Sequence, residues 1–289
     1  MNRLLYWAGH ALIAFVQAMP LRLVARAGRA SGMAAYYLDG RHRRVVSHNL
    51  QHCFGGQQSP ESLKNLAREH FRRVGENYLC AVKTASMSAQ DLAPHLEFTG
   101  THHLLDKPGC PPLQSCVVAI GHFGNFELYA RLQQVLPSYF CAATYRELKQ
   151  PAMNRLMMEL RSTSGCHFFE RRRDGAALRT LLNKPGMILG LLADQSSHGV
   201  RIPFLGRDCN TSTAPAVLAL RYECPLHTAI CYREGLARWK VEFGPEIPTR
   251  LADQPRPVED IMRDVNARLE QGVLRDPANW FWVHRRWKD

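Results

Sequence analysis

Residues 116–128 read CVVAIGHFGNFEL, and this stretch decides the fold because an apolar run ends in a glycine turn that carries polar groups. The first five residues have the length and composition of a buried strand. Gly121 and Gly124 permit a tight turn, and Asn125 suits the cap of a following helix. His122 is therefore expected in a turn at the carboxyl end of a strand, where open α/β sheets bind ligands.

The spacing of His122 and Glu127 bears on whether the two side chains act together. On one continuous helix, a five-residue offset turns about 500° and leaves the side chains about 140° apart. If His122 lies in a turn and Glu127 in the helix that follows, this angular separation no longer applies. A neutral imidazole can then take a proton from a hydroxyl, while a carboxylate bonded to its other nitrogen fixes the tautomer. The alternative is an ordinary turn histidine beside a carboxylate that favours a helix N-terminus.

The rest of the chain alternates strand-like and helix-like segments, which predicts an α/β fold with a mostly parallel central sheet flanked by helices. We expect residues 1–90 to form an N-terminal helical region that associates with a membrane. We expect residues 91–289 to form an α/β domain. Expected strands are 116–120, 139–143, 167–169, 187–193, 227–232 and 238–243, and we expect the last to pair antiparallel with its predecessor. Expected helices are 61–80, 125–135, 151–161, 175–182, 214–222 and 258–269.

The N-terminal segment Leu4 to Met19 is largely apolar but 16 residues long, whereas a spanning helix needs about 20. Arginines follow it at Arg22, Arg26 and Arg29, which sets the carboxyl-terminal side in the cytosol under the positive-inside rule. We expect a retained anchor that dips into or barely crosses a membrane leaflet. A cleaved signal peptide and a buried core helix are the alternatives.

Bulk composition restricts the partners. The formal charge is +12, with 37 Lys and Arg against 25 Asp and Glu, which favours anionic surfaces. Nucleic acid is not expected, because no RNP, helix-turn-helix or zinc-finger pattern occurs. Nine cysteines without a C-x-x-C pair fit a reducing compartment. No H-E-x-x-H motif is present, and no metal or cofactor is expected.

The block from His122 to Glu127 resembles the H-x4-[D/E] signature of the lysophospholipid acyltransferase superfamily. Its surroundings, GHFGNFEL, are most similar to the lipid A biosynthesis lauroyl/myristoyl acyltransferase family. Further matching segments follow in order along nearly the whole chain: Tyr145-Arg146, Arg161, residues 192–195, residues 211–215 and residues 282–288.

This resemblance implies roles for individual residues. His122 would deprotonate the acceptor hydroxyl, Glu127 would orient and charge-balance His122, and Arg161 would pair with Glu127 or hold a phosphate or a developing oxyanion. The remaining matches would shape the donor pocket or contact substrate, although helix capping and solvated loop charges are their simpler explanations: Arg146, Asp194, Gln195, Asn125, Thr213 and Arg285.

The resemblance also implies partners. The expected donor is a fatty acyl thioester of acyl carrier protein, and the expected acceptor is a lipid A precursor or a related anionic glycolipid. The expected location is the bacterial inner membrane, with the catalytic domain on its cytoplasmic face. One alternative is an acyl-CoA-dependent acyltransferase acting on another glycolipid or on a lysophospholipid. A noncatalytic, basic, peripheral lipid-binding protein is another.

Overall fold

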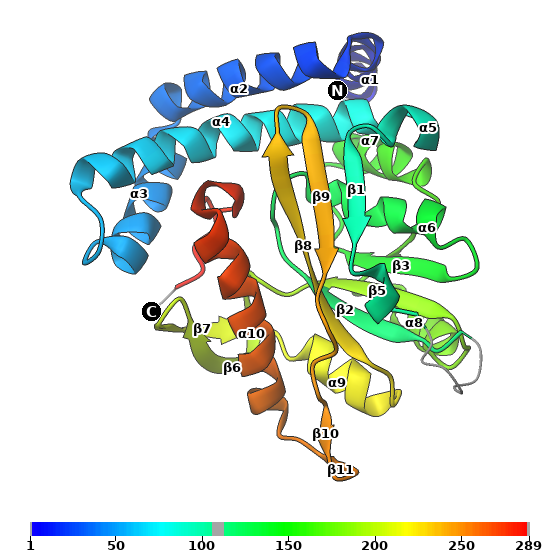
Figure 1. The fold of residues 1–289 in the computed structure, drawn as a ribbon. Helices are drawn as coiled ribbons and strands as arrows, with labels where there is room; N and C mark the ends of the chain where they lie inside the picture. The colour runs from blue at the N-terminus through cyan, green and yellow to red at the C-terminus, as the bar shows by residue number, and fades with distance from the viewer. Residues whose placement is uncertain (1, 106–112, 288–289) are drawn as a thin grey trace.

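A computed structural model describes residues 2–105 and 113–287 (Figure 1). Its centre is a seven-stranded sheet in the order β1-β9-β8-β2-β5-β3-β4, and within this sheet every pairing except β8–β9 is parallel. The mostly parallel sheet and the late antiparallel strand are thus confirmed. The strands are β1 Leu96–Thr99, β2 Cys116–Ile120, β3 Phe140–Tyr145, β4 His167–Glu170, β5 Met187–Leu192, β8 Leu226–Gly235 and β9 Arg238–Phe243.

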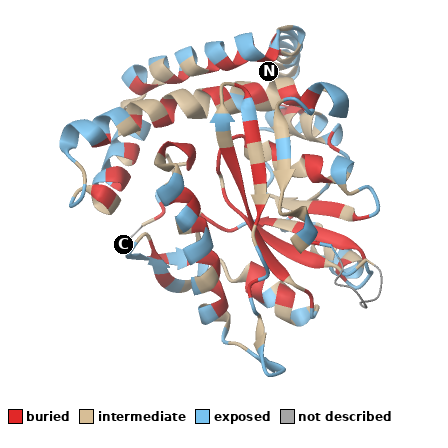
Figure 2. Ribbon diagram, in the orientation of Figure 1, coloured by how far each residue is buried: buried red, intermediate tan, exposed pale blue. Residues whose placement is uncertain are grey.

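The central strand β2 is buried on both faces, which explains its unbroken apolar sequence. Val117 and Ala119 belong to one hydrophobic cluster, and Cys116, Val118 and Ile120 to the other. Figure 2 shows that burial is concentrated in the central strands, whereas the helices are exposed along their outer sides. The helices that follow the sheet strands are α6 Leu132–Val135, α7 Pro151–Ser162, α8 Gly175–Leu182, α9 Ala214–Arg221 and α10 Val258–Arg275.

Four helices form the N-terminal region: α1 Asn2–Ala18, α2 Leu21–Leu38, α3 Gly40–Phe54 and α4 Pro60–Ala85. Helices α2 and α4 lie side by side across one end of the sheet (Figure 1). They approach closely at glycines, since a Cβ on Gly28 would come 2.6 Å from the carbonyl oxygen of Gly75. Glu76, fully buried in α4, binds Arg29 and Arg233 and so joins this layer to β8.

The apolar N-terminal segment forms α1, which packs against α4 and α7. Among the described residues, no helix is both long and apolar enough to cross a membrane. The predicted helix 61–80 is confirmed as part of α4, and the side chain of Ser59 caps it by accepting a hydrogen bond from the backbone N–H of Ser62.

Several elements differ from the expected ones. The segment after Asn125 is a 3₁₀-helix, η2 Phe126–Arg131, before the short α6. Asn125 does not cap it; its amide nitrogen lies 3.4 Å from the hydroxyl of Thr84. Strand β1 and a hairpin of β6 Ser196–Phe204 and β7 Arg207–Thr211 were not predicted, because β1 is short and the hairpin contains Pro203 and, in its turn, Gly206. Other short elements are α5 Ala89–Leu92, η1 Thr101–His103, β10 Arg250–Leu251, β11 Gln254–Pro255 and η3 Pro277–Asn279.

Candidate active site

The site begins where two neighbouring parallel strands end. Ile120 of β2 is paired with Leu192 of β5, and the Ala193 N–H donates to the Ile120 carbonyl at 2.9 Å. His122, two residues after Ile120, and Asp194, directly after Ala193, therefore meet at the carboxyl edge of the sheet. Nδ1 of His122 lies 2.7 Å from Oδ1 of Asp194, and the backbone N–H of His122 donates to Oδ2 at 2.7 Å.

Asp194 is held as a buried carboxylate, with 1% of its surface exposed. The indole N–H of Trp280 donates a further hydrogen bond to Oδ2 at 2.8 Å. Burial alone would raise the pKa of Asp194, but the attraction of His122 and the hydrogen bonds from His122 and Trp280 outweigh it and lower the pKa to about 2. Because the ionised carboxylate only accepts, Nδ1 of His122 carries a proton. In the neutral ring Nε2 is then the free base.

The imidazole of His122 remains reachable, with 13% of the side chain exposed. Two aromatic rings border it: Phe126 lies edge-on at 5.0 Å between centroids, and Phe281 stacks at 5.8 Å. The amide nitrogen of Gln195 lies 3.4 Å from Nε2. The base is thus enclosed on its ring faces while Nε2 is flanked by a polar donor.

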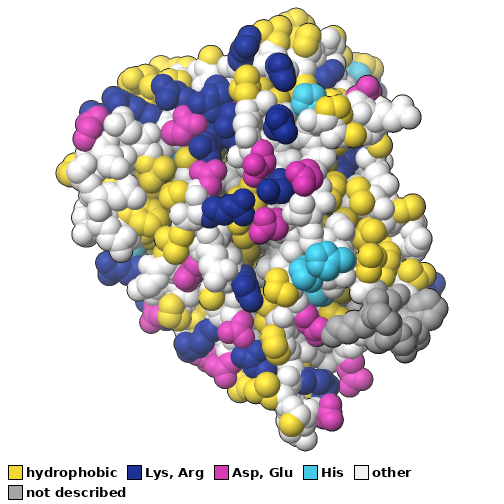
Figure 3. Space-filling model, viewed as in Figure 1, with side chains coloured by type: hydrophobic (Ala, Val, Ile, Leu, Met, Phe, Trp, Pro, Cys, Tyr) yellow, Lys and Arg dark blue, Asp and Glu magenta, His cyan; other side chains and the backbone are white. Residues whose placement is uncertain are grey.

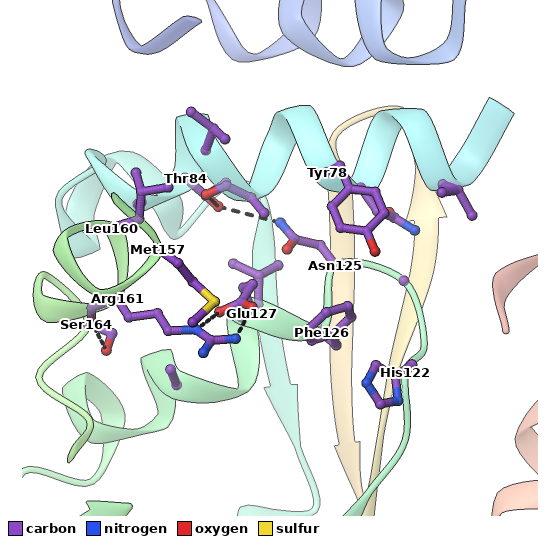
Figure 4. Close-up of a pocket in the computed structure, with 18 of the residues that line it drawn as sticks. Tyr78, Thr84, His122, Asn125, Phe126, Glu127, Met157, Leu160, Arg161 and Ser164 are labelled. Carbon is purple, nitrogen blue, oxygen red and sulfur yellow. Dashed lines mark hydrogen bonds and ion pairs between the residues drawn. The ribbon is translucent and has the colours of Figure 1, made fainter. Parts of the chain in front are cut away.

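Glu127 has a different partner from the expected one. Its carboxylate makes a bidentate ion pair with Arg161, at 2.9 Å from Nε to Oε2 and 2.6 Å from Nη2 to Oε1. Figure 4 shows Glu127 directed toward Arg161 rather than toward His122. The expectation that Glu127 orients His122 is therefore corrected: Asp194 occupies that position. Pairing with Glu127 was one of the alternatives that the resemblance implied for Arg161, and the structure contains this ion pair.

A cavity of about 430 Å³ runs beside these groups, within the size range of small-molecule sites. His122, Glu127 and Arg161 line it together with Asn125. Most of its wall is apolar and comes from three helices, namely Gly9, Leu12 and Ile13 of α1, Val74, Ala81 and Val82 of α4, and Met153, Leu156, Met157 and Leu160 of α7. The N-terminal helices and the sheet domain therefore build one cavity between them.

Polar atoms in the cavity wall lack a partner among the described residues. They include Nη1 of Arg161 and Oδ1 of Asn125, both buried (Figure 4). The side-chain oxygens of Asn77 and Asn279 share this property and also line the cavity. Buried polar groups are ordinarily hydrogen-bonded. An apolar cavity with a few such groups at one side suits an amphiphilic ligand, whose polar part would satisfy them.

The C-terminal segment fixes the loop that carries Asp194 and Gln195. Arg286 is fully buried, and its guanidinium donates to the carbonyl of Gln195 at 2.6 Å and to the hydroxyl of Thr211 at 2.8 Å. The expected residue at this position was Arg285, which is exposed. Both arginines lie in the matched segment 282–288, and their sequence positions give no reason to prefer Arg286 over its neighbour.

Three other expected site residues lie apart from the described cavity wall. Arg146 is exposed in the loop after β3, and Arg285 is exposed beyond the segment of Trp280. Thr213 precedes α9, but its side chain makes no capping bond; the Ser212 hydroxyl accepts from the Ala214 N–H instead. Trp280, whose indole N–H binds Asp194, was not predicted as a site residue. Cys110 and Lys288 lie outside the described residues.

The protein is thus an α/β protein in which a carboxylate-oriented histidine lines an apolar cavity. The family model of bacterial lipid A biosynthesis acyltransferases matches residues 1–289, and the chain belongs to that family. It is accordingly an acyltransferase of lipid A biosynthesis. A comparison with curated proteins found no match.

Proposed function

We propose that the enzyme transfers a fatty acyl chain from the thioester of an acyl carrier protein to a hydroxyl of a lipid A precursor. The observation that carries this proposal is the His122–Asp194 contact of 2.7 Å beside an apolar cavity. The cavity suits a hydrocarbon chain, and the oriented imidazole suits activation of a hydroxyl. No covalent acyl-enzyme is required.

In this mechanism Nε2 of His122 takes the proton of the acceptor hydroxyl as its oxygen attacks the thioester carbonyl carbon. Asp194 stabilises the imidazolium that forms. The tetrahedral intermediate collapses with cleavage of the carbon–sulfur bond, and the imidazolium returns the proton to the departing thiolate. The products are an ester, the free thiol of the carrier and neutral His122.

Arg161 and Glu127 contribute electrostatically. Two guanidinium nitrogens of Arg161 hold Glu127, while Nη1 is buried without a partner among the described residues. That N–H is a donor for the developing oxyanion or for a phosphate of the acceptor. Glu127 fixes the plane of the guanidinium, so we assign it as a positioning residue for Arg161.

Membrane association is part of the proposal and is supported by the outer face of α1. Trp7 and Phe15 are each 64% exposed, and Leu4 and Leu12 are also exposed on this helix. Their spacing gives one apolar stripe, typical of helices that lie in the plane of a membrane interface. Leu12 also lines the cavity, so the stripe adjoins it.

Positive charge accompanies this stripe. Arg22 and Arg26 are exposed on α2, the helix that follows α1. Figure 3 shows Lys and Arg side chains gathered at the end of the molecule where α2 and α4 lie, with hydrophobic side chains along the upper edge. Each basic residue near an anionic leaflet adds about 1 kcal/mol of attraction. We therefore propose binding to the cytoplasmic face of the bacterial inner membrane.

Vesicle flotation tests the membrane proposal. The variant W7E/F15E should lose most of its binding to vesicles containing anionic phospholipid, because two charges would enter the apolar stripe. The matched control L251E/L274E changes two exposed leucines elsewhere and should bind like the unmodified enzyme. Equal binding by all three proteins would contradict a membrane role for α1.

A donor and acceptor matrix tests the reaction itself. Purified enzyme would be supplied with acyl carrier protein or CoA thioesters and with a lipid A precursor, a simpler glycolipid or a lysophospholipid, and products identified by mass spectrometry. Acylation of the precursor hydroxyl from the carrier is the expected result. Transfer only from CoA thioesters would contradict the carrier protein as donor. Transfer only to another lipid would contradict the lipid A precursor as acceptor. Lipid binding without transfer to any acceptor would indicate a noncatalytic protein.

A further inference from the structure

Two adjacent loops at the carboxyl edge of the sheet carry exposed cations. One loop, residues 146–150, follows β3, and the other, residues 171–174, follows β4. Arg146, Lys149, Arg171 and Arg172 are exposed and form no ion pair with any described residue. We call these four residues the basic rim. Arg173 differs, because it lies 3.5 Å from Asp174.

The backbone of the rim is held by a buried carboxylate. Glu170, at the end of β4, accepts hydrogen bonds from the backbone N–H groups of Arg172 at 2.7 Å and Arg173 at 2.8 Å. Backbone hydrogen bonds from Arg173, Arg172 and Glu147 lower the pKa of Glu170 despite its burial. The Arg171 N–H donates to the Tyr145 carbonyl at 3.0 Å. The two loops are thus joined, and the cations project from a fixed backbone.

The rim also borders the cavity. Leu148 lies between two rim residues in sequence, lines the cavity and is exposed. In the sheet order, β3 is two strands and β4 three strands from β2, which ends at Ile120, two residues before His122. With about 4.8 Å between strands, the rim begins about 10 to 15 Å from the strand end that carries the base. A thioester on a flexible arm can cross that distance.

We propose that the basic rim docks the acidic surface of the carrier protein that delivers the acyl thioester. This inference rests on the proposed function. Unpaired cations on a rigid backbone complement an acidic partner and accelerate its encounter. The two loops that carry the rim contain one large apolar residue, Leu148, whereas the apolar stripe that suits a membrane lies on α1. An acidic protein therefore fits the rim better than a lipid surface does.

The test compares a carrier-bound donor with an uncharged one. The variant R171E/R172E should lower kcat/KM for the carrier-bound acyl thioester by about tenfold or more, mainly through KM. With the same acyl chain on N-acetylcysteamine, which has no charge to recognise, kcat/KM should change less than about twofold. Raising the ionic strength should weaken the reaction of the unmodified enzyme with the carrier more than that of the variant.

The matched control is R41E/R44E, which makes the same charge change on the exposed side of α3 and should react normally with both donors. Carrier binding measured by fluorescence anisotropy gives a readout that does not need turnover. Equal loss with both donors, or unchanged kinetics with the carrier, would overturn the rim assignment. If R171E/R172E lost binding to anionic vesicles but kept normal kinetics with the carrier, the rim assignment would also be overturned, and the rim would be a lipid contact. Failure of the unmodified enzyme to use any donor would instead reject the proposed function.

Discussion

Oδ1 of Asp194 lies 2.7 Å from Nδ1 of His122, although 72 residues separate them in the chain. The same carboxylate accepts the backbone N–H of His122, so it fixes both the ring and the turn that carries it. This arrangement leaves Nε2 as the ring nitrogen that can accept a proton from the substrate. The identity of the orienting residue follows from strand order rather than from sequence spacing.

Replacing the orienting carboxylate should disable the base. Asp194→Asn keeps the size of the side chain but presents an amide to Nδ1, which favours the wrong tautomer of His122. We expect kcat to fall by about 10⁴-fold. Steady-state acyl transfer measures this loss, and circular dichroism verifies the fold. A decrease below about tenfold in a folded variant would assign Asp194 a structural role only.

Trp280→Phe removes the indole N–H that donates to Asp194 and keeps an aromatic ring in place. A hydrogen bond to a buried charge contributes about 1.5–3 kcal/mol, so the free energy of unfolding should decrease by that order. The rate should fall by about tenfold because the carboxylate is less firmly held. Chemical denaturation and acyl-transfer kinetics measure the two effects. An unaffected rate at reduced stability would restrict Trp280 to packing.

Acid should remove the stabilisation that the charged form of Asp194 provides. Its pKa in the folded protein is lowered from 3.8 to about 2, so this contribution is complete above about pH 4 and is lost as the pH falls through about 2. The shift corresponds to about 2 kcal/mol. The stability difference between the unmodified enzyme and Asp194→Asn should therefore shrink over that range. Urea unfolding at several pH values measures it, and a constant difference would be inconsistent with the lowered pKa.

The ion pair of Glu127 and Arg161 should behave as one unit. Glu127→Gln and Arg161→Lys each break the bidentate contact, and each should reduce kcat by about 10²-fold. The double variant should lose little more than either single one, because both changes remove the same arrangement. Glu259→Gln, which breaks an exposed ion pair on α10, should leave the rate unchanged. Additive losses would show that the two residues act separately.

Features of the fold whose determinants are local could be predicted from the sequence. The buried strand before His122, the glycine turn and the alternation of strands and helices could all be read from composition and period. The partner of His122 could not, because Glu127 is close in sequence whereas Asp194 becomes close only when β5 inserts beside β2. Asp194 and Arg161 were both candidates through the family resemblance. Their pairings required the topology.

The contribution of the C-terminal segment to the site could not be predicted from the sequence either. Trp280 is 86 residues from the carboxylate it binds, and an aromatic segment gives no indication of a hydrogen-bond partner. The choice between Arg285 and Arg286 depends on which side chain faces inward. In an irregular segment neither helical nor strand periodicity decides that.

The central claim is that His122 removes the proton of the acceptor hydroxyl. Its most direct test is the rate of acyl transfer by His122→Ala, from a defined thioester to a lipid A precursor, followed by mass spectrometry beside the unmodified enzyme. We expect a loss of at least about 10³-fold, with an unchanged unfolding midpoint and retained vesicle binding. Transfer by a folded His122→Ala variant at a rate near that of the unmodified enzyme would contradict it.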